Sequence, residues 1–205
     1  ILKTKESGAV PVIVSPYFLD RNFEDPMRKM VEEINVKYKA LAEKYGITLW
    51  SFHLPFWKYD ISRPEVADET IAYHSELIRK ASAIGINKFV VHPSGEPIED
   101  SDRASRMARA KESLAILAEF AKAHGSVIAV EDLPRTCLGR NSDEVEELLS
   151  ARPDLRVCFD TNHLLTEDDC DFIRKLGSKI VTVHISDYDF INERHWLPGE
   201  GKLDW

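Results

Sequence analysis

Five residues with metal-binding side chains follow five successive apolar stretches of the chain. The first polar residue after each stretch is a histidine or a carboxylate: His53, His92, Glu131, Asp160 and His184. Imidazole nitrogen and carboxylate oxygen are the donors that zinc, manganese and cobalt ions take in proteins. Any one of these residues alone is best explained as a hydrogen-bonded structural group. Five in succession favour a site for a divalent metal ion.

The stretch Val157–Leu165 (VCFDTNHLL) shows this pattern most clearly. Its first three residues are small or apolar and indicate the end of a buried strand. Asp160 and His163 follow three residues apart, where the strand gives way to a loop, so one cation could bind the oxygen of the first and the nitrogen of the second. By contrast, His74 and His124 fall in predicted helices, where a structural role is expected.

Short apolar runs alternate with amphipathic stretches along the chain. Six strands are predicted, at Val10–Val14, Ile47–Phe52, Asn87–Val91, Val127–Val130, Leu155–Phe159 and Ile180–Val183. The predicted helices run from Asp25-Pro26 to Gly46, from Glu65 to Ile84, from Ser101 to His124, from the N-cap Ser142 to Ser150, and from Glu167 to Leu176. The strands are apolar throughout, as in sheets covered on both faces. Strand–helix alternation predicts parallel strands joined by right-handed crossovers.

This order predicts an α/β fold of the (β/α)8 TIM barrel class, because the sites of such barrels lie at the carboxyl ends of the strands. The alternative, a doubly wound open sheet, places functional residues at one switch point beside a glycine-rich loop that this sequence lacks. A full barrel has about 250 residues, whereas this chain has 205 and opens in what reads as a helix tail, Ile1–Ser7. We therefore expect one barrel domain over residues 1–205, truncated at both ends, with about six βα units present and the first strand and last unit missing.

The composition excludes several classes of protein. The chain is 43% hydrophobic and 30% charged, an ordinary globular mix, and its net charge of −8 argues against general nucleic-acid binding. Cys137, Cys158 and Cys170 form no C-x-x-C pair, so neither a disulfide framework nor a thiolate zinc site is expected. No apolar run approaches the length of a membrane span and no signal peptide is visible. A cytoplasmic protein is expected, with export left open because the start of the barrel is missing.

Six short motifs accompany the metal-binding residues. They are FHLPF at Phe52–Phe56, VVHPS at Val90–Ser94, AVEDLP at Ala129–Pro134, FDTNH at Phe159–His163, VHISD at Val183–Asp187 and LPGEG at Leu197–Gly201. Together they resemble the xylose isomerase-like TIM barrel superfamily, and more narrowly its sugar phosphate isomerase/epimerase members. The resemblance implies one divalent metal ion (Mn, Mg, Co or Zn), no nucleotide cofactor, and a small sugar or sugar phosphate as substrate.

The resemblance also implies roles for single residues. Glu131 and Asp160 match two carboxylate ligands of the family's metal, and His184 matches its histidine ligand. The fourth ligand of the family, a glutamate on the eighth strand, has no counterpart in this sequence. His163 matches a histidine that binds a substrate oxygen, and Arg194 lies near the position of an arginine that helps to hold the substrate.

These roles predict an isomerase or epimerase. The metal would chelate a carbonyl oxygen and the neighbouring hydroxyl, and Glu131 would remove the proton alpha to the carbonyl, through an enediolate. His195 is expected to act with His163 and Arg194 in orienting hydroxyls or a phosphate. Four aromatic residues are candidates for the apolar face of the sugar, with core packing as the alternative: Trp50, Phe56, Trp57 and Trp196.

A second hypothesis comes from another branch of the superfamily, the apurinic-site endonucleases, which bind three zinc ions. In that case His53, His92, His163 and His195 would be additional metal ligands. The endonucleases have an aspartate where this chain has Glu193, and the acidic charge also argues against DNA as the substrate.

A third hypothesis is a barrel without catalytic activity that binds a sugar or a partner protein. Open parallel strand edges would then need a cover, such as another copy of the chain. Association into a homo-oligomer stays open.

Overall fold

The computed structural model describes residue 37 and residues 39–205. Three predicted features lie outside these residues: the helix tail Ile1–Ser7, the strand Val10–Val14 and the helix start at Asp25-Pro26. Residues 39–45 are helical, and Gly46 follows with a φ of 59°. This left-handed conformation suits glycine, which has no Cβ to clash with the backbone. The helix therefore ends at the residue that the sequence indicated.

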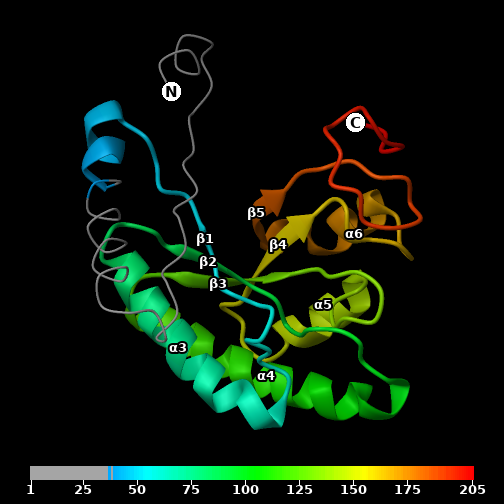
Figure 1. Ribbon diagram of the computed structural model, residues 1–205, viewed down its shortest axis with the longest axis horizontal. Helices are drawn as coiled ribbons and strands as arrows, with labels where there is room; N and C mark the ends of the chain where they lie inside the picture. The colour runs from blue at the N-terminus through cyan, green and yellow to red at the C-terminus, as the bar shows by residue number, and fades with distance from the viewer. Residues whose placement is uncertain (1–36, 38) are drawn as a thin grey trace.

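Within the described residues, five parallel strands form one sheet, in which each strand pairs with its neighbours in sequence order. Their bounds are β1 Phe52–His53, β2 Lys88–Val91, β3 Val127–Glu131, β4 Arg156–Asp160 and β5 Ile180–His184. The strands fan out from β1 to β5 with helices between them (Figure 1). Sequential parallel order with intervening helices is the arrangement of part of a TIM barrel. The predicted fold class is confirmed for the described residues.

The first of these strands is shorter than the predicted Ile47–Phe52. Phe52 pairs with Phe89 and His53 pairs with Val90. Since β2 begins only one residue before Phe89, only one residue of the chain before β1 lies opposite β2. Pairing continues beyond β1 instead, where the next backbone N–H donates to the Val90 carbonyl at 2.9 Å.

Helices connect the strands close to the predicted positions. Their bounds are α3 Pro64–Ser82, α4 Asp100–Ala123, α5 Ser142–Leu149 and α6 Asp169–Leu176, followed by a 3-10 turn at Gly177–Lys179. α3, α4 and α5 lie along one side of β1–β3 (Figure 1). The opposite side of the curved sheet is therefore its inner surface, which in a barrel faces the barrel axis.

The starts of α5 and α6 differ from the predicted ones, and one contact accounts for both differences. α5 begins after Asn141, whose side chain accepts a hydrogen bond from the Glu144 N–H at 2.9 Å, so Ser142 is the first helical residue and not the cap. The backbone N–H and the hydroxyl of Ser142 instead donate to the carboxylate of Glu167. Glu167 therefore lies in the loop, and α6 begins two residues later after its cap Asp168.

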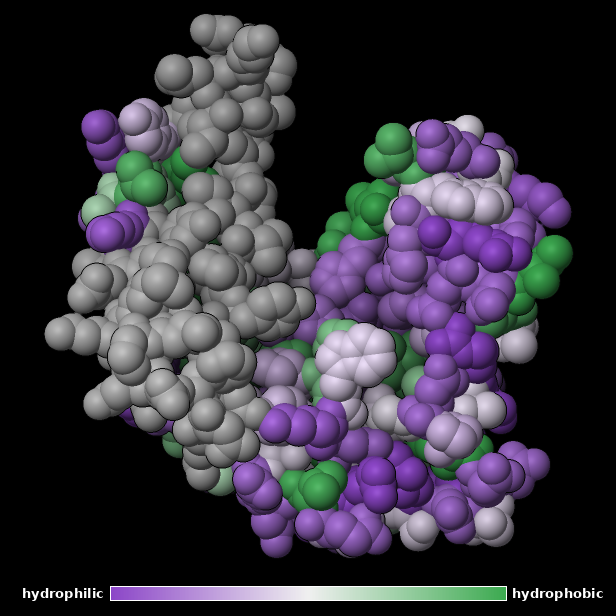
Figure 2. Space-filling model, viewed as in Figure 1, coloured by the Kyte–Doolittle hydropathy of each residue, from purple (hydrophilic) through white to green (hydrophobic). Residues whose placement is uncertain are grey.

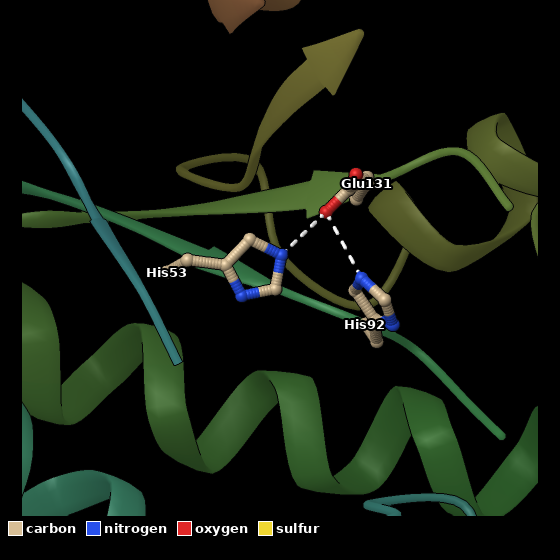
Figure 3. A group of neighbouring side chains, drawn as sticks. All are labelled: His53, His92 and Glu131. Carbon is tan, nitrogen blue, oxygen red and sulfur yellow. Dashed lines mark hydrogen bonds and ion pairs between the residues drawn. The ribbon is translucent and has the colours of Figure 1, made fainter. Parts of the chain in front are cut away.

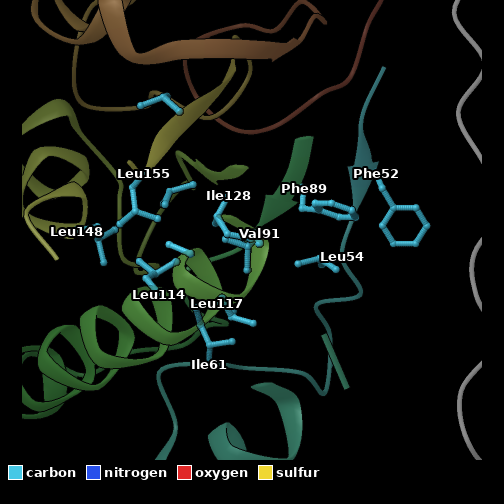
Figure 4. Packing of buried hydrophobic residues seen from close by; sticks show 14 of the residues in the cluster. Phe52, Leu54, Ile61, Phe89, Val91, Leu114, Leu117, Ile128, Leu148 and Leu155 are labelled. Carbon is cyan, nitrogen blue, oxygen red and sulfur yellow. The ribbon is translucent and has the colours of Figure 1, made fainter. Parts of the chain in front are cut away.

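Each strand presents one face to the helices and one to the inside of the curl, because successive side chains point in opposite directions. Phe89 and Ile128 are among the fully buried residues that pack against the helices (Figure 4). Val90, Ala129 and Cys158 point the other way and form a small, separate cluster on the inner face. These inner side chains are fully buried but small, which leaves room above them for other groups.

This alternation places the candidate site. Two residues beyond the three inner-face residues come His92, Glu131 and Asp160, which therefore share the inner face at the carboxyl end of the sheet. His184 ends β5 opposite Asp160 in the strand register. Residues that are far apart in sequence thus reach the same end of the curl.

The surface of the described part of the chain is mainly polar. Figure 2 shows polar side chains over most of the described portion of one face, with hydrophobic areas that are small and separate. Across the residues that the structure describes, no helix has both the length and the apolar character needed to cross a bilayer.

Candidate metal centre

Glu131 is the centre of a cluster of histidines. Its side chain is 2% exposed, and one oxygen, Oε2, lies 2.9 Å from His53 Nε2 and 3.2 Å from His92 Nε2. Both imidazoles point at this oxygen from neighbouring strands (Figure 3). The other oxygen, Oε1, accepts a hydrogen bond from His184 Nδ1 at 2.8 Å. One buried carboxylate therefore meets three imidazoles.

Asp160 and His163 lie on the other side of the same carboxylate. Asp160 Oδ2 is 3.5 Å from His184 Nδ1 and 3.7 Å from His163 Nε2. The Nδ1–H of His163 donates to the backbone carbonyl of Asp132 at 2.7 Å, which turns Nε2 toward the site. The structure thus brings together all five strand-end residues that the sequence singled out, and His163 with them.

The donor set fits a divalent cation. Two ligands that bind the same cation at about 2.1 Å lie roughly 3 to 3.5 Å apart, close to the distances of 2.8 Å and 3.5 Å from His184 Nδ1 to Glu131 and Asp160. In the described part of the chain, Glu131 also belongs to each of three groups of side chains whose donor atoms lie within 4.8 Å of one another. Its partners in these groups are His53 with His92, Asp160 with His163, and Cys158 with His184. Mixed nitrogen and oxygen donors suit zinc, manganese and cobalt.

The electrostatics of the cluster also favour a cation. Burial by itself would raise the pKa of Glu131, but the hydrogen bonds from three imidazoles hold this pKa well below its usual value. Burial would lower the pKa of His184, but its contacts with Asp160, Cys158 and Glu131 raise this pKa far above the ordinary range. For His163, burial is likewise outweighed by Glu193 and the nearby carboxylates, which raise the pKa to about 9. The site therefore stabilises positive charge.

Of the other residues predicted to bind the substrate, His195 lies close to this centre and Arg194 does not point toward it. His195 has a φ of 52°, and its ring stands edge-on to that of His163 with the centroids 6.3 Å apart. Arg194 points elsewhere, since its guanidinium binds Asp189 at 2.8 Å and lies over the Trp196 ring.

A cavity of about 190 Å³ adjoins the cluster. His92 and His163 reach it from the metal centre, and Phe56 and Trp57 form an aromatic wall, in which Phe56 stacks on His92 at 4.1 Å. Trp57 is 88% exposed and extends to the cavity mouth. This volume is smaller than the roughly 300 to 1,000 Å³ of pockets for drug-sized ligands, so the cavity suits a small molecule.

Two of the four aromatic candidates lie away from this cavity. The Trp50 ring packs under Lys88 Nζ at 3.5 Å, and the backbone of Trp196 pairs with that of Asp187. Neither residue is among the described residues that line the cavity. Phe56 and Trp57 lie beside the site because they follow β1 directly, whereas Trp50 precedes it.

Three residues of the site have contacts that the sequence analysis did not predict. Cys158 Sγ lies 3.7 Å from His184 Nε2, which its position two residues before Asp160 on the same strand face could have indicated. Arg135 and Glu193 line the cavity, and Glu193 Oε1 reaches His163 Nε2 at 3.1 Å. No spacing in the sequence indicated these last contacts, because they join separate loops.

Comparisons with known proteins agree with this architecture. The family model described as "Xylose isomerase-like TIM barrel" matches residues 17–205. A curated relative, an uncharacterized protein of Methanocaldococcus jannaschii, is 22% identical over 169 residues, which are 80% of this chain and 66% of that protein. The chain therefore spans slightly less than two thirds of the length of this relative.

Solved structures of sugar epimerases share the fold. A D-tagatose 3-epimerase-like protein is 21% identical and superposes with a TM-score of 0.78, covering 94% of this chain and 73% of that one. L-ribulose 3-epimerase is 22% identical with a TM-score of 0.73, covering 99% of this chain and 66% of that one. At these identities the likeness establishes the fold. The match to the family model extends over most of the chain, and this chain belongs to the xylose isomerase-like TIM barrel family.

Proposed function

We propose that this chain belongs to a divalent-metal-dependent isomerase or epimerase of a sugar or sugar phosphate, which removes the proton alpha to a carbonyl. The observation that carries the proposal is the meeting of Glu131, Asp160 and His184 beside a small cavity. L-ribulose 3-epimerase and the D-tagatose 3-epimerase-like protein, which share the fold, support the same class of reaction.

Each residue has a distinct task in this proposal. Glu131, Asp160 and His184 would hold the cation, which supplies positive charge next to the substrate oxygens and so stabilises the negative charge that develops on deprotonation. Glu131 is also the proposed base, because its carboxylate is ionised and lies beside the position of the cation that would hold the substrate oxygens. His163 presents Nε2 to the cavity and would orient a substrate hydroxyl. The aromatic wall would pack against the apolar face of the sugar.

Proton exchange with solvent tests the role of Glu131. In D2O, the wild-type protein loaded with Mg2+ is expected to incorporate deuterium next to the carbonyl of a ketose such as D-fructose, which NMR detects. A Glu131→Gln variant should lose this exchange by a factor of about 100 or more, the range that general base catalysis contributes. Removal of the metal with a chelator should have the same effect, and restored metal should reverse it. Exchange at the wild-type rate in Glu131→Gln would remove Glu131 as the base.

A second candidate function has a specific observation in its favour. His53 and His92 both contact the same oxygen of Glu131, and the three form one of the possible metal-binding groups. A second metal ion bridged by Glu131 would suit a phosphodiesterase that uses metal-bound hydroxide on abasic DNA. The two functions differ in metal content and substrate. Three zinc ions per chain with cleavage of abasic DNA would favour the phosphodiesterase, and one ion with ketose exchange favours the isomerase.

A further inference from the structure

Arg135 occupies a constrained position on the wall of the cavity. It follows β3 in the loop beyond Glu131 and has a φ of 53°, in the left-handed region that non-glycine residues seldom adopt. Its Nε lies 3.0 Å and 3.1 Å from the two carboxylate oxygens of Glu96. Its Nη1 donates to the side chains of Glu193 and Asn192. The guanidinium is thus engaged along two of its edges.

Arg135 and its partners come from three different loops. Glu96 follows β2, Arg135 follows β3 and Glu193 follows β5, and all three line the same cavity. The side chains of the three residues are only partly exposed, at 33%, 38% and 22% respectively. Two carboxylates thus surround one guanidinium, and Glu193 also contacts His163 Nε2 at 3.1 Å. We call these three residues the acidic clamp.

Nearby arginines are also paired with carboxylates. Arg106 binds Asp60 at 2.6 Å, and Asp60 is only 6% exposed. Arg194 binds Asp189 at 2.8 Å. Neither of these guanidinium groups offers an unpaired charge to the cavity. The carboxylates that face a ligand at the acidic clamp are therefore those of Glu96 and Glu193. Arg135 contacts both of them, and His163 contacts Glu193.

We propose that the acidic clamp makes the cavity select an uncharged sugar over the phosphate ester of the same sugar, with Glu96 and Glu193 as specificity-determining residues. This inference rests on the proposed function and deepens it. Sugar hydroxyls can donate to the two carboxylates and accept from the guanidinium, so a neutral sugar loses few hydrogen bonds on leaving water. A phosphate ester carries between one and two negative charges at pH 7. It would meet two carboxylates of the same sign and would have to displace one of them to reach Arg135.

The test compares two ligands in each protein. Dissociation constants of D-fructose and D-fructose 6-phosphate are measured by calorimetric titration of the Mg2+-loaded protein. We expect the wild type to bind D-fructose more tightly. In a Glu96→Gln/Glu193→Gln variant, the ratio of the two constants should move toward the phosphate ester by about tenfold or more, the size of a hydrogen bond between charged groups.

Controls separate the acidic clamp from general effects of charge and folding. Because Glu193 also contacts His163, the preference is read as a ratio within one protein, which cancels losses that are common to both sugars. A Glu76→Gln/Glu146→Gln variant removes two carboxylates from the outer helices α3 and α5, and its ratio should match that of the wild type. Glu96→Gln alone should shift the ratio in the same direction by less, and it serves if the double variant does not fold.

The outcomes separate this inference from the function on which it rests. Tighter binding of D-fructose 6-phosphate by the wild type would overturn the inference alone, since a sugar phosphate isomerase remains an isomerase. A ratio that stays unchanged in both clamp variants would also overturn it. If neither sugar binds and no solvent exchange occurs, the proposed function fails and the inference fails with it.

Discussion

At the scale of single residues, the candidate site depends on how one buried carboxylate is shared. Glu131 contacts His53, His92 and His184. In the described part of the chain, it also belongs to all three groups of side chains that could hold a metal ion. Its oxygen Oε2 faces His53 and His92, whereas Oε1 faces His184 and the side of the site where Asp160 lies. The residue is therefore placed to take part both in cation binding and in proton transfer.

Cys158 raises a question at this scale, because its sulfur lies next to His184 and could either bind the metal or support the histidine. Burial raises the pKa of the Cys158 thiol to about 12, which disfavours the thiolate that metals bind. We therefore expect its sulfur to accept a hydrogen bond from His184 Nε2–H at their separation of 3.7 Å and to hold the ring in place for the metal.

Cobalt binding distinguishes these two roles of Cys158. The Co2+-loaded protein should show no thiolate-to-cobalt charge-transfer band, and Cys158→Ala should weaken Co2+ binding about tenfold, as is usual for residues that support a metal ligand. Cys158→Ser should bind Co2+ more tightly than Cys158→Ala, because the hydroxyl can accept the same hydrogen bond. Cys170→Ala, at an exposed position, is the control. A charge-transfer band that disappears in Cys158→Ala would instead make the sulfur a ligand.

At the scale of elements, helices fix the loops that carry the site. α3 lies beneath β1 and β2 and presents His74, which is 1% exposed, to the loop that follows β1. Its Nε2–H donates to the Pro55 carbonyl at 2.9 Å. This contact anchors the chain between His53 and the aromatic wall, so a histidine outside the metal centre still contributes to its position. The structural role expected for His74 agrees with this contact.

The buried position of His74 predicts a loss of stability in acid. Burial lowers its pKa from 6.5 to about 4, against a smaller opposing effect of the hydrogen bond to Pro55. Between these two pH values the unfolded chain binds a proton and the folded chain does not. The stabilisation is therefore complete above pH 6.5 and is lost as the pH falls toward 4, by roughly 3 kcal/mol in all.

Denaturant unfolding at several pH values checks this prediction. The difference in unfolding free energy between pH 7 and pH 4.5 should be larger by about 2 kcal/mol in the metal-free wild type than in a His74→Gln variant. The glutamine amide can still donate to Pro55 but does not titrate. Parallel stability curves for the two proteins would show that His74 is not the responsible group.

At the scale of the whole molecule, the centre joins parts of the chain that only the fold brings together. Glu131 ends β3, Asp160 ends β4 and His184 ends β5. An unfolded chain would not present these three side chains to one ion, so a cation that binds them binds the folded state selectively. Metal binding and folding are therefore coupled.

This coupling can be measured as added stability. At a Mn2+ concentration about 100 times the dissociation constant, the unfolding free energy should rise by about 2.7 kcal/mol. An Asp160→Asn variant should lose most of this gain at the same Mn2+ concentration, because the amide is a weaker ligand. Ca2+ at the same concentration serves as a comparison, since it prefers more oxygen donors than this site offers. An equal gain in the Asp160→Asn variant would place the binding ion elsewhere.

Much of the fold could be predicted from local patterns. The strands β2 to β5 lie within about one residue of their predicted positions, because short runs of mostly apolar, often β-branched residues that end at a polar residue indicate a buried strand. β1 could not be bounded in this way, because its length depends on where β2 begins. The cap of α5 was also missed, because Glu167 binds Ser142 from 25 residues away in the chain.

The sequence by itself determined which residues end the strands and on which face they lie, because side-chain direction alternates with a period of two along any strand. That was enough to place Glu131, Asp160 and His184 at one end of one sheet; their roles as ligands and base stay predictions. Only the tertiary structure decided the surroundings of the centre. Arg135 meets Glu96 and Glu193 across 39 and 58 residues of chain. Such contacts depend on how three loops fold against one another, and no local period encodes them.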